Sequence, residues 1–204
     1  MTKDSYFHKS RAGAVGAPLF VLVHGTGGDE NQFFDFGSRL LPQATILSPV
    51  GDVSEHGAAR FFRRTGEGVY DMADLARATG KLADFVKANR EHYQAGPVIG
   101  LGFSNGANIL ANVLIEQPGL FDAAVLMHPL IPFEPKISPA KATRRVLITA
   151  GERGPICPVP LTKALEKNLQ AQGGTVETVW HPGGHEIRSS EIDAVREFLS
   201  VYGE

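Results

Sequence analysis

Short apolar runs alternate with helix-like segments along nearly the whole chain, and this order constrains the fold more than any other feature. The first run, Pro18 to Val23, is almost continuously apolar, as expected for a strand buried on both faces. Further strands are predicted at 44–47, 97–101, 123–127, 145–149 and 175–180. A helix capped by Asp29 or Asn31 is predicted up to about 41, and further helices at 71–93, 107–117 and 161–172, with a last helix capped by Ser190. The apolar residues of helix 71–93 are expected on one face: Met72, Leu75, Leu82, Phe85 and Val86. This alternation predicts an α/β fold with a mostly parallel, twisted sheet flanked by helices.

Length and composition favour a single α/β domain spanning residues 1–204. We find no internal repeat, low-complexity tract or linker. Charged residues make up 21% of the chain and the net charge is −2, so no strong field favours nucleic acid or an anionic membrane. Residues 1–17 lack the apolar run of a secretory signal, and no stretch is long enough to span a bilayer. We expect a cytoplasmic protein without nucleic-acid partners or integral membrane contact, and the sequence leaves a homodimer open.

One predicted strand leads into a G-x-S-x-G sequence, Gly102 to Gly106, and a helix-like segment follows it. In this strand–turn–helix context, a serine is held on a sharp turn with its hydroxyl above the sheet. Glycines are needed beside it because the turn leaves no room for a Cβ. The pattern predicts that Ser104 is a nucleophile, and such a serine needs a neighbouring base.

The base is expected in the segment after the last strand, which reads Trp180-His181-Pro182-Gly183-Gly184-His185. A histidine follows the serine and the acid in the chain order of α/β hydrolases. We favour His185 over His181, since a residue adjoining a strand usually points into the packing. His24 and His128 also follow predicted strands and could line the same site.

The stabilising groups for a developing oxyanion are expected to be backbone N–H donors. The amide of Asn105, directly after the serine, is one candidate, and that of Thr26 in the Gly-rich turn 24–28 is the other. The turn could instead cradle a phosphate, but neither phosphate-binding glycine pattern is complete here.

The chain resembles the α/β-hydrolase superfamily, and more narrowly its small carboxylesterase/phospholipase branch, which is acyl-protein-thioesterase-like and related to dienelactone hydrolases. Four motifs in the family's order carry the resemblance over about residues 15–203: segments 24–30, 102–107, 150–156 and 183–185. The resemblance implies a three-layer α/β-hydrolase fold and hydrolysis of small carboxylic esters, lysophospholipid or thioesters included, without metal or organic cofactor. It also implies Ser104 as nucleophile, His185 as base, and Thr26 and Asn105 as oxyanion donors.

The sequence departs from the family at the position of the catalytic acid, where Gly154 stands before Pro155. The acid normally fixes the tautomer of the histidine and stabilises its imidazolium, and its loss costs on the order of 10⁴ in kcat. Three interpretations stay open. The protein is a weakened esterase, its acid has moved to Glu134 or Glu152, or it is a hydrolase-like protein that only binds a small ligand.

Three further features of the sequence bear on a possible functional site. Phe61, Phe62 and Arg63 form a candidate pocket wall, although phenylalanines in such a loop often pack on the core instead. Cys157, the only cysteine, is expected to be a buried or half-buried thiol. A zinc site built on the two histidines of segment 180–185 is disfavoured, because proline and glycine between them oppose a helix.

Overall fold

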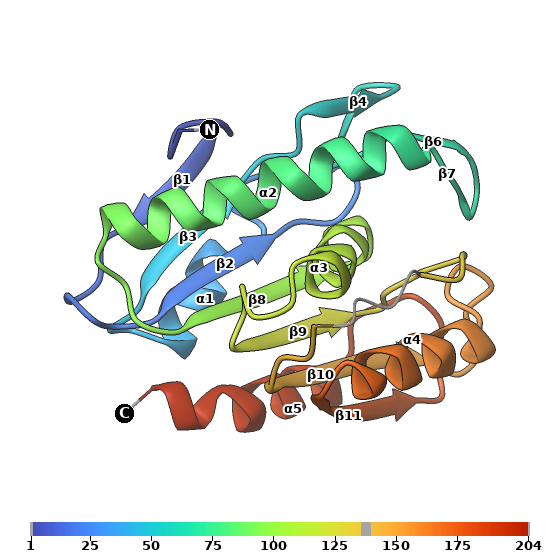
Figure 1. The fold of residues 1–204 in the computed structure, drawn as a ribbon. Coiled ribbons are helices and arrows are strands. Elements are labelled where there is room, and N and C mark those ends of the chain that lie inside the picture. The colour runs from blue at the N-terminus through green and yellow to red at the C-terminus, as the bar shows by residue number, and fades with distance from the viewer. Residues whose placement is uncertain (1, 136–139, 204) are drawn as a thin grey trace.

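A seven-stranded sheet lies between two layers of helices in a computed structural model that describes residues 2–135 and 140–203 (Figure 1). Its strand order is β1-β3-β2-β8-β9-β10-β11, and all neighbours are parallel except the edge pair β1 and β3. The strands are β1 (His8–Arg11), β2 (Leu19–Val23), β3 (Thr45–Pro49), β8 (Val98–Phe103), β9 (Ala123–Met127), β10 (Arg144–Gly151) and β11 (Gly174–His181). The predicted parallel sheet flanked by helices is confirmed.

The helices divide between the two faces of the sheet (Figure 1). They are α1 (Phe34–Leu40), α2 (Met72–His92), α3 (Asn105–Glu116), α4 (Val159–Ala171), α5 (Ser189–Leu199) and the 3₁₀ turn η1 (Ser200–Tyr202). Helices α2, α3 and α4 share one apolar cluster with Val21 and Val23 of β2. Helices α1 and α5 share the other with Phe20 and Leu22. Adjacent strand residues therefore face opposite layers, which explains why this strand is apolar throughout.

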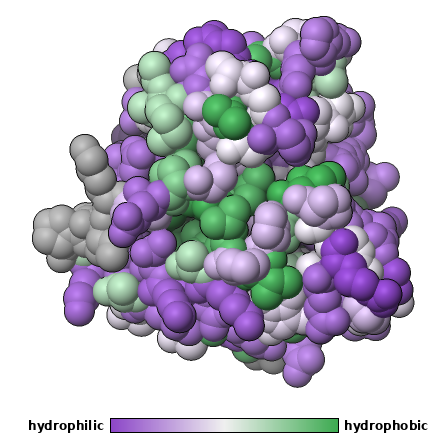
Figure 2. Space-filling view, turned by 90° about the vertical axis from the view of Figure 1, so that its right-hand side faces the viewer, coloured by the Kyte–Doolittle hydropathy of each residue, from purple (hydrophilic) through white to green (hydrophobic). Residues whose placement is uncertain are grey.

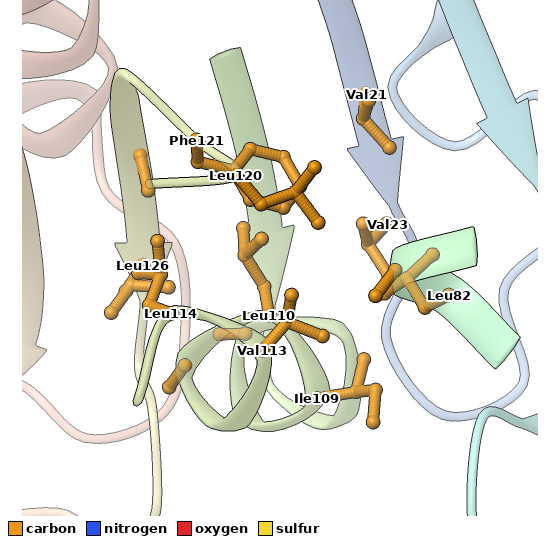
Figure 3. Packing of buried hydrophobic residues seen from close by; sticks show 14 of the residues in the cluster. Val21, Val23, Leu82, Ile109, Leu110, Val113, Leu114, Leu120, Phe121 and Leu126 are labelled. Atoms are coloured by element: carbon orange, nitrogen blue, oxygen red, sulfur yellow. The ribbon is translucent and has the colours of Figure 1, made fainter. Parts of the chain in front are cut away.

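The centre of the first cluster is formed by α3, which lies against β8 and β9 (Figure 3). Leu110, Val113 and Leu114 of α3 point toward the sheet, where Leu126 of β9 meets them (Figure 3). These side chains are at most 1% exposed. Their burial fixes the helix that directly follows the G-x-S-x-G turn, and thereby fixes the turn itself.

The sequence missed one strand of the sheet and two small hairpins. The edge strand β1 is polar and short, so nothing in its pattern indicates its pairing with β3. The predicted irregular loop at 51–68 holds the pairs β4 (Val53–Glu55) with β5 (Ala58–Arg60) and β6 (Arg64–Gly66) with β7 (Val69–Tyr70). Glu55 of β4 forms ion pairs with Arg60 of β5 and with Arg64 of β6, and the second pair links the two hairpins.

Two predicted helix starts were wrong. Helix α1 begins at Phe34 without a side-chain cap, and Asp29 instead accepts a hydrogen bond from the amide of Asn31 within a local turn. Helix α5 begins at Ser189, and Glu191 rather than Ser190 receives the amide of Arg188 at 2.7 Å. In both cases a competing local hydrogen bond decided where the helix begins.

The long helix α2 follows its predicted pattern. Asp71 caps it by accepting the amide of Asp74 at 3.0 Å. Of the apolar residues expected on one face, Leu75, Leu82, Phe85 and Val86 are buried, and Met72 in the first turn is 50% exposed. No helix among the described residues is long and apolar enough to cross a membrane.

The parallel register aligns the ends of the central strands. Phe103 pairs with Met127, and Met127 pairs with Thr149, so the loops after β8, β9 and β10 begin side by side. Gly151 pairs with His181, which brings the loop after β11 to the same edge. Figure 2 shows this side of the molecule, where hydrophobic residues line the bottom of a hollow and hydrophilic residues surround it. The carboxyl edge of such a sheet is where ligands bind in α/β folds.

We predict opposite stability effects for two Gly→Ala substitutions. A Cβ at Gly106 would fall well inside contact distance of the carbonyl oxygen of Val23, whereas a Cβ at Gly80, inside α2, meets nothing within 4 Å. Gly106→Ala should lower the free energy of unfolding by about 1–3 kcal/mol. Gly80→Ala should raise it by roughly 0.5–1 kcal/mol, because glycine costs more backbone entropy in a helix. Urea unfolding of both variants measures this, and equal effects would contradict it.

Candidate active site

Ser104 occupies a strained turn between β8 and α3. Its backbone has φ 50° and ψ −116°, values that a residue with a Cβ rarely adopts. The Ser104 amide donates to the carbonyl of Met127 at 2.9 Å, and the Ser104 carbonyl accepts the amide of Asn108 at 2.9 Å. These two bonds hold the turn from β9 and from α3. Gly102 and Gly106 permit it, because a Cβ on either would collide with neighbouring backbone.

His185 meets Ser104 from the loop after β11. Its Nε2 lies 3.0 Å from Oγ of Ser104, within hydrogen-bond distance. The other ring nitrogen, Nδ1, lies 3.7 Å from Sγ of Cys157. Ser104 and His185 are 81 positions apart in the chain, and the structure brings them together as the sequence predicted.

Two backbone amides are candidates for an oxyanion hole, those of Thr26 and Asn105. Both residues line the same cavity as Ser104. Within residues 2–135 and 140–203, no protein acceptor is seen for either amide. Side chains fix both residues: Arg60 donates to Oγ1 of Thr26 at 2.7 Å, and Oδ1 of Asn105 accepts the amide of Phe61 at 2.8 Å. Free N–H groups held in this way are suited to bind an oxyanion.

The cavity over Ser104 has a volume of about 290 Å³ and a polar wall. Its side chains include Arg60, Arg64, Tyr70 and Leu130 as well as Cys157.

The predicted pocket wall of Phe61, Phe62 and Arg63 is not part of this lining. Both phenylalanines are fully buried in the apolar cluster that also holds residues of α2 and α3. Arg63 points outward and pairs with Asp71 and Asp74. Arg60 and Arg64, on either side of residues 61–63, line the cavity instead.

No described carboxylate takes the place of the acid at Nδ1 of His185. Glu152 is exposed, and Glu134 borders a separate groove beside α4. Gly154 lies against the backbone of Gly184, and a Cβ there would make ordinary contacts of 3.4–3.6 Å. The turn therefore has room for an acidic side chain that this sequence does not supply.

A buried cluster of His128, His181 and Glu191 lies beside His185, with His128 in ring contact with it. Nε2 of His128 lies 2.8 Å from one oxygen of Glu191, and Nε2 of His181 lies 3.3 Å from the other. Burial alone would raise the pKa of Glu191, but the hydrogen bonds it accepts from His128, Thr149 and the Arg188 backbone hold its pKa below the usual range.

Sequence patterns indicate little of this cluster. Its three groups could ligate a metal ion by type and spacing, but the carboxylate is already hydrogen-bonded to His128 and lies 3.3 Å from Nε2 of His181. His128 also borders the cavity, whereas His24 does not: its Nδ1 lies 2.6 Å from the carbonyl oxygen of Gly25, and its Nε2 accepts the amide of Gly51 at 2.9 Å. Glu191 lies in the first turn of α5, shortly after the 183–185 motif, but no sequence pattern pairs it with His128, so only the folded chain shows the contact.

The pKa of His185 is lowered from its ordinary value. Burial of the imidazole is the main cause, because it disfavours the charged form, and nearby His128 adds to the effect. Glu67, Glu191 and Glu186 act in the opposite direction but do not prevail. The lowered pKa favours the neutral imidazole, the state that a general base needs.

The parallel sheet with a serine elbow and a facing histidine defines an α/β hydrolase. The chain belongs to the dienelactone hydrolase family, whose model matches residues 55–191. It is 36% identical over 182 residues to MhqD of Bacillus subtilis (strain 168), covering 88% of this chain and 91% of that protein.

Solved structures agree with this assignment. The chain is 91% identical to the protein Atu2452 of unknown function from Agrobacterium tumefaciens strain C58, with full coverage of both chains and a TM-score of 0.97. It is 31% identical to a Bacillus cereus carboxylesterase, covering 95% of this chain and 93% of that one, with a TM-score of 0.89. The expected resemblance to carboxylesterases of the α/β-hydrolase fold is confirmed.

We predict that the imidazole of His185 titrates below the ordinary histidine pKa, and that Gly154→Asp raises its pKa. A carboxylate near Nδ1 favours the imidazolium, which would oppose the effect of burial. NMR titration of the histidine side chains measures both values, with His185→Gln to assign the signal. A pKa at or above the ordinary value in the unsubstituted protein would contradict the burial argument.

Proposed function

We propose that the protein is a serine carboxylesterase that hydrolyses small carboxylic esters through Ser104 and His185, without a carboxylate on the histidine. The observation that carries this proposal is the 3.0 Å approach of His185 Nε2 to Ser104 Oγ on a strained elbow. Family membership supports the hydrolase class, and the carboxylesterase relative supports the ester.

The proposed reaction is acyl transfer to water in two steps. Oγ of Ser104 attacks the ester carbonyl while Nε2 of His185 takes its proton. The amides of Thr26 and Asn105 hold the oxyanion. The imidazolium then protonates the leaving alcohol, and the C–O bond to it breaks. In the second step, His185 takes a proton from a water molecule as the water oxygen attacks the acyl carbonyl. The imidazolium then returns this proton to Oγ of Ser104 while the bond from Oγ to the acyl carbon breaks and the acid leaves.

The cavity favours a compact substrate. Its volume of about 290 Å³ is at the low end for ligand pockets, which suits a short acyl group better than a long chain. Arg60 and Arg64 face it, but both pair with Glu55, and Glu67 pairs with Arg64 as well. The wall is thus polar and nearly balanced in charge. A panel of p-nitrophenyl esters, short thioesters and a lysophospholipid compares the candidate substrate classes.

Turnover should be slow, because nothing stabilises the imidazolium as a carboxylate would. The same feature favours the competing function, a hydrolase-like protein that binds a small ligand without turning it over. A serine-directed fluorophosphonate separates the two, since only an activated Ser104 reacts with it.

We predict that Ser104→Ala abolishes fluorophosphonate labelling and reduces ester hydrolysis to the background rate. Ser190→Ala, which changes an exposed serine in the first turn of α5, is the matched control and should leave both unchanged. Gel fluorescence and absorbance assays measure the outcome. Absence of labelling in the unsubstituted protein would favour the binding function, and labelling that survives Ser104→Ala would place the nucleophile elsewhere.

We also predict that Gly154→Asp raises kcat on a short p-nitrophenyl ester by at least about 10²-fold, a figure discounted from the effect of removing a triad acid. The turn has room for the side chain. Gly154→Asn is the matched control, because it has nearly the same shape but no charge. Equal rates for the two variants would show that the carboxylate is not what the site lacks.

A further inference from the structure

The environment of His185 Nδ1 decides which nitrogen of this ring carries the proton. For Nε2 to accept the proton of Ser104, Nδ1 must carry the ring proton and needs a partner. Among the contacts of the described residues, that partner is the sulfur of Cys157, at 3.7 Å. This separation is within the range of hydrogen bonds to sulfur.

Two carboxylates close to His185 in the chain are occupied elsewhere, and Glu67, which borders the same cavity, pairs with Arg64. Glu191 is hydrogen-bonded to Nε2 of His128 and to the amide of Arg188, and Nε2 of His181 lies 3.3 Å from its other oxygen. Glu186 accepts the amide of Gly184 at 2.9 Å and pairs with Arg188. The oxygens of both carboxylates are thus paired with neighbouring groups in the segment 184–191 or with His128. Neither is seen in contact with His185 in the described part of the chain.

The orientation of the Cys157 thiol is fixed by a second contact. Its Sγ donates to the carbonyl oxygen of His128 at 3.2 Å, and the side chain is only 4% exposed. Burial raises the pKa of Cys157 to about 12, so the group remains a thiol at neutral pH. With its hydrogen directed to a carbonyl, the sulfur keeps lone pairs that can accept a hydrogen bond.

Cys157 also comes from the segment that would carry the acid. It lies three residues after Gly154, in the loop between β10 and α4, and it borders the same cavity as Ser104 and His185. The loop therefore presents a side chain to His185 even though position 154 has none.

We propose that Cys157 is a positioning residue for His185: its sulfur accepts Nδ1–H, keeps Nε2 free to face Ser104, and partly replaces the absent carboxylate. This inference rests on the proposed Ser104–His185 chemistry. A neutral thiol can fix the tautomer, but it cannot neutralise the imidazolium. Its contribution is therefore smaller than that of a triad acid, about 3- to 10-fold in kcat, as expected for one ordinary hydrogen bond.

The test is a double-mutant cycle between positions 157 and 154. Cys157→Ala should lower kcat on p-nitrophenyl acetate by about 3- to 10-fold with little change in KM. Cys157→Ser should recover most of the loss, because a hydroxyl can also donate to His128 and accept from Nδ1. In the Gly154→Asp background, the effect of Cys157→Ala should vanish, since the carboxylate then holds the proton.

Equal losses in both backgrounds would overturn the proposal, because they would mean that the thiol acts only through packing. No loss in the unsubstituted background would overturn it as well. Urea unfolding of each variant controls for stability.

A measurement on the unsubstituted protein keeps the proposal falsifiable if Cys157→Ala does not fold. Proton–nitrogen correlation spectra at neutral pH show which nitrogen of His185 is protonated. We expect the proton on Nδ1, and a proton on Nε2 would overturn the assignment. This readout needs no turnover. Failure of labelling and hydrolysis would thus refute the esterase, and only the tautomer and the cycle would refute the role of Cys157.

Discussion

The strained backbone at Ser104 is the constraint on which the rest of the site depends. A serine with positive φ persists only where its surroundings hold it. Here β9 accepts its amide, α3 begins immediately after it, and Gly106 lets the helix approach the end of β2 without a Cβ in between. The apolar face of α3 is buried against the sheet, so the packing energy of the core supports the unfavourable conformation at the turn.

Once the elbow is fixed, the other groups reach it along the carboxyl edge of the sheet. Parallel pairing brings the loops after β2, β8, β9, β10 and β11 to one side, where each supplies a residue to the cavity. The loops are anchored by separate polar contacts: Thr26 by Arg60, and Cys157 by the carbonyl of His128. The site is thus a set of loop residues with independent supports on a rigid sheet.

We propose that Gly154 stands where the family has its acid, and the orientation of His185 does not depend on a side chain there. Position 154 keeps its turn but lacks its side chain, and the ring of His185 is still oriented toward Ser104. Burial keeps the imidazole neutral, which serves the proton-accepting step but opposes formation of the imidazolium. The proposed attack by Ser104 therefore has the geometry that it needs, but no described carboxylate compensates the positive charge of the His185 imidazolium. For this reason we expect low turnover although the family fold is retained.

Apolar runs, glycines and motif order are local signals, so the α/β layers, the elbow and the approach of His185 to Ser104 could be predicted from the sequence. The sequence also has Gly154 where the family resemblance implies an acid. The fold alone reveals that Phe61 and Phe62 belong to the core, that Arg60 and Arg64 face the cavity, and that Cys157 lies at Nδ1 of His185. These facts depend on contacts between segments that are distant in the chain, and no spacing along the sequence encodes them.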